Sequence, residues 1–328
     1  MSLAEKIMIK FAENTGLTST KPSKRYLWTD AFAICNFIQL YKQTKDKSYK
    51  KLAIDLMDQV HKTLGKYRKD DENREGWLAS RKHPTKKGLR IGKPLPERES
   101  DDPIDQQLEW ERDGQYFHYL TKWMIALVKM GNFLNEKKYI TWAVDLVEAS
   151  QAFIRDNRMY WKMSIDLSRP LIHSMGQHDP LDGYTTFKFV NNYSEQDLSK
   201  EINKMYKLTQ SIRLPTRDPL GIGNMLVDAY RLYRLRGNKE FVDKIIKAAK
   251  SGLQMFNKNV HTLAFRELGL AIGVKGAQKM DKLNSYWQMG EEITEYWQNH
   301  CDWKEHKEIN QVMLVTSLIP DEFLRESK

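Results

Sequence analysis

Residues 25–65 read RYLWTDAFAICNFIQLYKQTKDKSYKKLAIDLMDQVHKTLG, and this stretch determines the fold that we predict for the whole chain. Positions 27–41 are apolar almost all round, which is typical of a helix that is buried on every side. Positions 49–64 place apolar residues three to five apart among Lys, Asp and Gln, which predicts an amphipathic surface helix. With a polar break at 42–47 between them, the two helices form an αα-hairpin. Such a hairpin cannot bury its inner helix alone, so neighbouring hairpins must cover it.

The same pairing of an apolar and an amphipathic helix returns along the chain. The last predicted inner helix has no partner after it, and the amphipathic segment 3–12 can supply one. The hairpins then close into a ring, which removes the capping repeats that an open solenoid needs. We therefore predict an all-α fold, an (α/α)6 barrel or toroid of six helical hairpins in a single domain, 1–328. The further inner helices are expected at 113–129, 180–189, 220–235, 263–277 and 306–318, and their outer partners at 137–154, 195–212, 240–256 and 284–297.

An open helical solenoid of the HEAT or TPR kind is the alternative architecture. The uneven spacing of the predicted hairpins and the absence of a TPR signature argue against it. Of the 328 residues only 17 are Gly and 10 are Pro, and no Gly/Ser-rich or Pro-rich linker marks a domain boundary. The composition therefore agrees with one large helical domain.

Compartment and oligomeric state are expected from what the sequence lacks. No apolar run approaches the roughly 20 residues that a membrane span needs, and the N-terminus shows no signal-peptide pattern. The two cysteines, Cys35 and Cys301, suit a reducing compartment. We therefore expect a cytoplasmic monomer or homodimer with no membrane partner.

Much of the formal net charge of +10 lies in one segment, because residues 62–98 hold twelve Lys or Arg against five Asp or Glu. The overlapping segment 67–108 is also the longest without a helical period, and its prolines predict a long loop. Long loops inside compact domains are usually functional or disordered. A basic loop could meet nucleic acid, an acidic sugar or only solvent. Because no RNA- or DNA-binding signature is present, we expect no nucleic-acid partner.

The long connections are expected to gather at one end of the ring. Links from an outer to the next inner helix are long at 15–26, 67–108 and 156–179, whereas links from inner to outer helices are short. In a ring of parallel inner helices, the long links all lie over the helix N-termini. Functional residues usually lie on such loops, so we expect the site at this end.

Acidic residues recur near the starts of the predicted inner helices. Asp is a preferred N-cap, and for Asp218 and Asp30 this structural role is favoured. Six helix starts around a ring nevertheless point at one central cleft, where aromatic rings stack on sugar faces and two carboxylates can flank a glycosidic bond. The acids are Asp30, Asp113, Asp179, Asp182, Asp218 and Glu267, and the aromatic neighbours are Trp28, Phe32, Tyr116, Tyr119, Trp123 and Tyr184.

The strings WTDAF at 28–32 and LYKQTKDKSYKKLA at 40–53 resemble the opening hairpin of six-hairpin glycosidase-like proteins. Members of this superfamily include unsaturated glucuronyl hydrolases and N-acylglucosamine 2-epimerases. The string HDPLDGY at 178–184 resembles the HDxGF string of the hydrolases, although it introduces the third hairpin and not the second. The resemblance implies a hydrolase acid pair at Asp113 and at Asp179 or Asp182.

From these residues we predict a carbohydrate-active enzyme that hydrolyses a glycosidic or vinyl-ether-like bond of an acidic or unsaturated sugar. The substrate is expected to be a small molecule or an oligosaccharide. Asp113 and Asp179 are the acid/base candidates, with Asp182 and Asp30 as supporting carboxylates. The other predicted substrate contacts are a sugar platform of Trp28, Tyr116 and Trp123, anion clamps at Arg81 and Arg112, and further contacts from His118, His178, Glu267 and His306.

Two other functions stay open. A sugar 2-epimerase or isomerase needs two histidines on opposite sides of a sugar ring, and His178 and His306, near starts of inner helices, supply such a pair. A non-catalytic toroid that binds saccharide or protein is the alternative from another class. We expect no metal and no cofactor, because the histidines show no HExxH spacing and GIGNM at 221–225 lacks the third glycine of a dinucleotide-binding motif.

Overall fold

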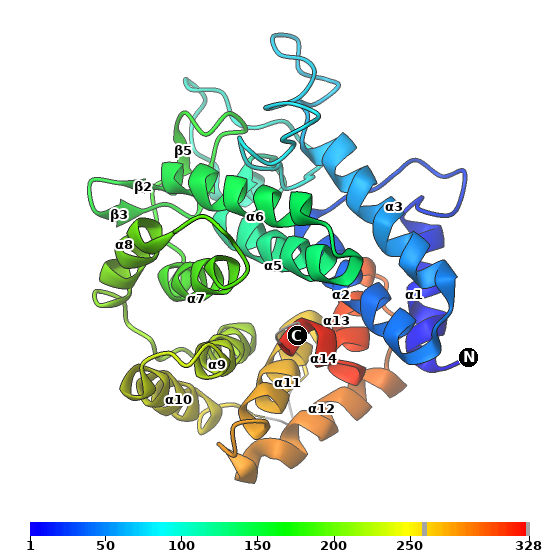
Figure 1. Ribbon diagram of the computed structural model, residues 1–328, viewed down its shortest axis with the longest axis vertical. Coiled ribbons are helices and arrows are strands. Elements are labelled where there is room, and N and C mark those ends of the chain that lie inside the picture. Colours follow the sequence, from blue (N-terminus) through cyan, green and yellow to red (C-terminus); the bar gives the residue numbers. More distant parts are fainter. Residues whose placement is uncertain (258–260, 326–328) are drawn as a thin grey trace.

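The computed structural model describes residues 1–257 and 261–325, which form two concentric rings of helices (Figure 1). This confirms the (α/α)6 toroid expected from the sequence. The inner ring consists of α2 (Leu27–Thr44), α5 (Phe117–Leu134), α7 (Asp179–Asn191), α9 (Pro219–Arg234), α11 (Ala264–Gln278) and α13 (Lys307–Leu318). The outer ring consists of α3 (Lys47–Leu64), α6 (Lys137–Ala149), α8 (Ser199–Thr209), α10 (Lys239–Leu253), α12 (Trp287–Asn299) and α1 (Leu3–Asn14).

Burial of the first hairpin follows its apolar pattern. Every residue of α2 from Leu27 to Leu40 is buried, as expected for an inner helix. Helix α3 starts at its N-cap Asp46, which accepts the backbone N–H of Ser48 at 2.8 Å, and buries a single stripe of its surface. The ring closes as predicted, because α1 packs on α13 and α13 packs on α2.

Helices α9 and α11 approach each other through glycine. A Cβ atom on Gly223 would lie 2.2 Å from the backbone oxygen of Gly269, and one on Gly273 would lie 2.4 Å from the backbone oxygen of Gly223. Backbone atoms in a packed pair of helices cannot move aside as the end of a side chain can. The spacing of these two inner helices therefore requires glycine at the contact.

The second inner helix starts later than predicted. Residues 113–116 do not join α5, because Gln115–Tyr116 form strand β1, which pairs antiparallel with β4 (Lys162–Met163). This pairing ties the loop before α5 to the loop before α7. The remaining short elements are α4 (Gln106–Glu109), η1 (Ser150–Phe153), β2 (Ile154–Arg155), β3 (Arg158–Met159), β5 (Pro170–Ile172), η2 (Asn284–Tyr286) and α14 (Asp321–Leu324).

Helix α14 lies in the middle of the ring, at the C-terminal ends of the inner helices (Figure 1). The ring of Phe323 stacks on Phe32 with centroids 4.5 Å apart, and Arg231 Nη2 donates to the carbonyl of Phe323 at 3.1 Å. Lys42, near the end of α2, pairs with the buried carboxylate of Glu322. These contacts occupy one end of the barrel, so the loops over the N-termini of the inner helices remain as the place for a site.

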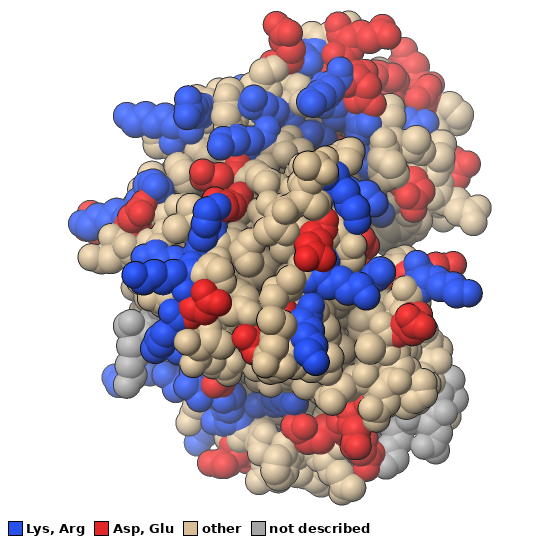
Figure 2. Space-filling model, turned by 90° about the vertical axis from the view of Figure 1, so that its right-hand side faces the viewer, with Lys and Arg blue, Asp and Glu red and all other residues tan. Residues whose placement is uncertain are grey.

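The outer face that carries α1 and α3 mixes both signs of charge. Figure 2 shows Lys and Arg side chains interleaved with Asp and Glu, with acidic side chains gathered at one end of the molecule. None of the helices formed by the described residues combines the length and apolarity that a bilayer-spanning helix requires.

Replacing Gly223 with Ala should destabilise the toroid, because the added methyl group would meet the backbone of α11. We expect a loss of about 2 kcal/mol in the free energy of unfolding, measured from urea denaturation midpoints. The matched control is Gly276→Ala on α11, where an added Cβ finds its nearest neighbour at an ordinary 3.5 Å. Ala is the better helix former, so the control should be neutral or more stable by up to about 1 kcal/mol. Equal effects at the two positions would contradict the role given to Gly223.

Candidate active site

A cavity of about 500 Å³ lies over the N-termini of α5, α7 and α9. We call it the carboxylate cavity, because Asp179, Asp182 and Asp218 line it. His118 and His178 also border it. Within the described part of the chain, none of its lining residues is Lys or Arg. The cavity therefore combines carboxylate and imidazole groups, which are the side chains used most often for proton transfer.

Asp182 is held by three donors from one turn of α5. Its Oδ1 accepts from Lys122 Nζ at 2.7 Å, and its Oδ2 accepts from Thr121 Oγ1 at 2.5 Å and lies 2.9 Å from His118 Nδ1. Burial opposes ionisation of Asp182, but the charge of Lys122 and the hydrogen bonds from Lys122 and His118 outweigh it and lower the pKa of the carboxyl group. An ionised carboxylate only accepts hydrogen bonds, so His118 Nδ1 carries a proton and Nε2 is the free acceptor.

The pKa of Asp179 shifts in the opposite direction to that of Asp182. It lies one turn before Asp182 on α7, so the two carboxyl groups share a helix face. Only 8% of Asp179 is exposed, and its Oδ2 has no hydrogen-bond partner among the described residues. Burial and the negative charge of Asp182 raise the pKa of Asp179 to about 7. A pair of carboxyl groups with pKa values pushed apart is the arrangement that separates an acid from an ionised partner.

The opposite wall of the carboxylate cavity is aromatic. Tyr116, Tyr119, Trp161 and Trp110 line it, and the ring of Tyr116 lies 4.7 Å from that of Trp161 and 5.0 Å from that of Tyr119. The hydroxyl group of Tyr116 is buried without a hydrogen-bond partner in the described structure. Flat apolar rings with a few polar groups are suited to bind the faces of sugars.

No protein-family model matches this sequence, and a comparison with curated proteins finds no match either. Solved structures do match over nearly the whole chain. A GH76 α-mannanase of Bacteroides thetaiotaomicron aligns with a TM-score of 0.65 at 8% identity, covering 99% of this chain and 98% of that chain. The GH76A α-1,6-mannanase of Salegentibacter aligns with a TM-score of 0.62 at 13% identity, covering 96% of this chain and 97% of that chain.

A third similar structure is the cellobiose 2-epimerase of Spirochaeta thermophila, with a TM-score of 0.58 at 11% identity and coverage of 98% of both chains. At such identities the likeness establishes the fold. The chain has the (α/α)6 toroid fold of these structures. In this toroid the predicted residues Tyr116, His118, His178, Asp179 and Asp182 come together at the carboxylate cavity.

The six-hairpin toroid places two predicted platform residues in its core instead. Trp28 is buried against Phe32, with ring centroids 4.5 Å apart. Trp123 is buried too, and its Nε1 donates to His61 Nε2 at 3.1 Å. Both tryptophans lie on inner helices and are buried among protein side chains, so the prediction that they bind sugar is corrected. The rings that line the cavity include Trp110 and Trp161, which the sequence pattern missed; both lie on or next to the long links between outer and inner helices.

Asp30 and His306 lie in a second cavity of the toroid, of about 610 Å³, over α2 and α13. Burial raises the pKa of Asp30 to about 6, although Arg25 at 3.6 Å opposes the shift. The hydroxyl groups of Tyr26 and Tyr119 meet at 2.6 Å, and each of the two rings borders a different cavity. The expected convergence of every acid on one cleft is therefore corrected, because Asp30 lies in a different cavity from Asp179 and Asp182, and other predicted acids border neither cavity.

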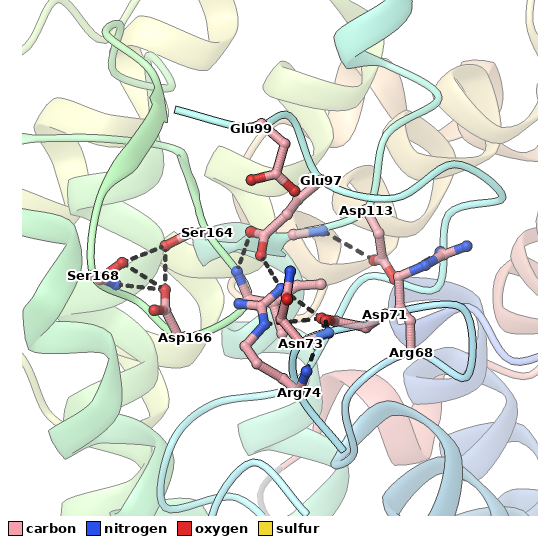
Figure 3. A network of polar contacts seen from close by, with 12 residues as sticks. Arg68, Asp71, Asn73, Arg74, Glu97, Glu99, Asp113, Ser164, Asp166 and Ser168 are labelled. Atoms are coloured by element: carbon pink, nitrogen blue, oxygen red, sulfur yellow. Dashed lines mark hydrogen bonds and ion pairs between the residues drawn. The ribbon is translucent and has the colours of Figure 1, made fainter. Parts of the chain in front are cut away.

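Asp113 holds the long loop of the toroid and borders neither cavity (Figure 3). It is fully buried and pairs with Arg90, while Arg68 Nη1 lies 3.4 Å from its Oδ2. Its Oδ1 accepts the backbone N–H groups of Gly92 and Gly114, both at 3.0 Å. The predicted acid/base role is corrected, because these donors occupy the carboxylate and keep it from substrate.

Further ion pairs neutralise positive charges of the basic loop, residues 67–108. Arg74 pairs with Asp71 at 2.7 Å and with Glu97 at 2.6 Å, and Glu97 also accepts the backbone N–H of Ile165 at 2.7 Å (Figure 3). The positive charges in this part of the loop therefore fix its shape. They bind acids of the same chain, which leaves them less available for a partner.

Of the remaining predicted residues, Asp218 lines the carboxylate cavity, whereas Arg81, Arg112 and Glu267 do not. Arg112 pairs with Asp102 at 3.6 Å. Glu267 is buried and accepts from Trp297 Nε1 at 2.9 Å, so it binds within the protein. Arg81 is exposed, and its role as an anion clamp stays a prediction. Asp218 is the N-cap of α9, as favoured from sequence, and accepts the backbone N–H of Gly221 at 3.0 Å.

Across residues 1–257 and 261–325, no group of three or more His, Cys, Asp or Glu side chains is placed to hold a metal ion.

Asp113→Asn should destabilise the protein, because it leaves Arg90 buried without its negative partner. Breaking a buried ion pair from one side typically costs about 3 kcal/mol. Urea denaturation measures the loss, with Glu195→Gln as the control. Glu195 pairs with Lys137 at 2.5 Å, but both side chains are more than four-fifths exposed, so its loss should leave the denaturation midpoint nearly unchanged. A stable Asp113→Asn protein would show that Asp113 does not hold the loop.

Proposed function

We propose that this protein is a carbohydrate-active enzyme that hydrolyses a glycosidic bond of an uncharged saccharide in the carboxylate cavity. The observation that supports the proposal most is the pair of carboxyl groups on one face of α7, Asp179 with a raised pKa and Asp182 with a lowered one. An acid that keeps its proton beside an anion that keeps its charge is what glycoside hydrolysis requires.

In the proposed reaction, Asp179 donates its proton to the glycosidic oxygen as the bond from this oxygen to the anomeric carbon breaks. The ionised Asp182 stabilises the positive charge that develops on the sugar ring. The two carboxylate oxygens of Asp182 already accept hydrogen bonds from Lys122 and Thr121, so Asp182 activates the attacking water indirectly, through its hydrogen bond with His118. The free Nε2 of His118 accepts a proton from the water that attacks the anomeric carbon. Burial and the charge of Lys122 lower the pKa of His118, which keeps its Nε2 unprotonated near pH 7.

The charge of the cavity favours a neutral sugar over the acidic or unsaturated sugar that the sequence predicted. No Lys or Arg among the described residues lines the cavity, and the nearby cations Lys122 and Arg266 already pair with Asp182 and Asp218. A uronic acid would therefore find no cationic side chain on the cavity wall to pair with. Two of the similar solved structures, a mannanase and a cellobiose epimerase, are named for uncharged saccharides. Both observations support a hexose oligosaccharide as the substrate class.

A sugar epimerase is the second candidate, and one observation favours it. His118 and His178 border the same cavity, whereas His306 of the predicted pair lies in the other one. Burial lowers the pKa values of both His118 and His178, so both rings are neutral near pH 7 and able to accept a proton. The Nε2 of His178 lies 2.7 Å from the carbonyl oxygen of Leu214, which assigns the proton to Nε2 and leaves Nδ1 free.

The pH dependence of kcat/KM should show an alkaline limb set by Asp179. Hydrolysis needs Asp179 protonated, and its pKa is about 7. Activity should therefore fall about tenfold per pH unit once the pH is well above 7. The base His118, whose pKa is lowered from 6.5, adds an acid limb only below that value. Asp182 stays ionised at these pH values because its pKa is lowered, so it adds no acid limb. Activity that rises through pH 7 would contradict Asp179 as the acid.

Product analysis separates the two candidate reactions. Wild type and Asp179→Asn are incubated in D₂O with α-1,6-linked mannose and β-1,4-linked glucose oligosaccharides. Hydrolysis yields shorter saccharides, and Asp179→Asn should lower the rate by about 10³-fold or more because the acid is lost. Epimerisation instead yields products of unchanged length that carry deuterium next to the former carbonyl carbon. Full turnover by Asp179→Asn would contradict the proposed acid, and no turnover by wild type would favour a binding protein.

A further inference from the structure

Five aromatic rings form an unbroken row across the mouth of the toroid. The row runs from Trp110 through Trp161, Tyr116 and Tyr119 to Tyr26, with consecutive ring centroids 5.2, 4.7, 5.0 and 5.4 Å apart. The first four rings border the carboxylate cavity. Trp110 and Trp161 also border a third cavity of about 410 Å³, and Tyr26 borders the cavity that contains Asp30. The row therefore connects three cavities, and the proposed acid Asp179 lies in the middle one.

The outer end of the row is exposed yet firmly held. The side chain of Trp110 follows the short helix α4 and is 56% exposed. The preceding residue, Glu109, is buried and accepts from Arg98 Nε at 2.8 Å and from Lys162 Nζ at 3.0 Å. Trp161 packs beside Trp110, and its own Nε1 donates to Ser174 Oγ at 2.9 Å.

An indole ring that stays exposed to water lacks the stabilising free energy that its burial would provide. Exposed apolar surface of this kind, fixed at the rim of a cavity, is typical of a ligand-binding surface. The outer cavity offers an anion no cationic side chain to bind, because no Lys or Arg among the described residues lines it. The apolar faces of neutral sugar rings match such a surface in both shape and charge.

We propose that the five rings form a binding track for an extended neutral oligosaccharide, in which Trp110 and Trp161 bind a sugar unit beyond those that flank the bond cleaved at Asp179. The track rests on the proposed function, since that function places the reacting bond in the carboxylate cavity. It names the substrate more closely, as a chain longer than a disaccharide. Because Trp110 is farthest from Asp179 on this side of the row, it determines the preferred chain length.

The test measures binding without turnover. In the Asp179→Asn background, isothermal titration calorimetry gives the affinities of α-1,6-linked mannose and β-1,4-linked glucose oligosaccharides of two, three and four units. Affinity should rise with length for at least one of the two series. Adding Trp110→Ala should weaken binding of the four-unit chain about tenfold and that of the two-unit chain less than about twofold, because only the longer chain reaches the outer ring.

The matched control is Trp287→Ala, which removes a similarly exposed indole, 47% accessible, from the outer helix α12. It should leave all affinities unchanged. The track is overturned if Trp110→Ala binds the four-unit chain as tightly as its background does, or if none of these oligosaccharides binds. The proposed role of Asp179 in the reaction is tested separately from the track. Full turnover by Asp179→Asn would reject the proposed acid while a length-dependent loss on Trp110→Ala still supported the track.

Discussion

The candidate site depends on a buried ion pair between Lys122 of α5 and Asp182 of α7, two neighbouring inner helices. Both side chains are almost fully buried, and a charge left unpaired at that depth would be strongly destabilising. The pair therefore ties the two helices together and keeps Asp182 ionised. Its negative charge in turn favours the protonated forms of two buried neighbours, Asp179 and Asp228, whose pKa values are raised first by burial to about 7 and about 8.

The packing of the ring directs this arrangement toward one end of the barrel. Helix α14 occupies the other end, where Phe323 and Glu322 bind the ends of inner helices. At the open end, the long loops are fixed by ion pairs such as Arg90 with Asp113, and by the pairing of β1 with β4. These contacts position Tyr116 and Trp161 opposite Asp179. The aromatic wall and the carboxyl groups thus come from different hairpins that only the closed ring brings together.

The helices could be predicted from the sequence, because burial of a helix leaves a local period, as the stripes of α2 and α3 show. Asp179 and Asp182 could also be paired, since three-residue spacing places them on one helix face. Asp113 could not be distinguished from them locally, because what buries it is Arg68 and Arg90, which lie far away in the loop. The same limit applies to aromatic rings, whose burial depends on the helix that packs against them.

The most direct measurement is a crystal structure of the Asp179→Asn variant with an α-1,6-linked mannose tetrasaccharide bound. The account predicts a glycosidic oxygen within hydrogen-bond distance of the side chain at position 179, with the face of an adjoining sugar unit on Tyr116. A saccharide bound only beside Asp30 and His306, with the carboxylate cavity empty, would contradict the account.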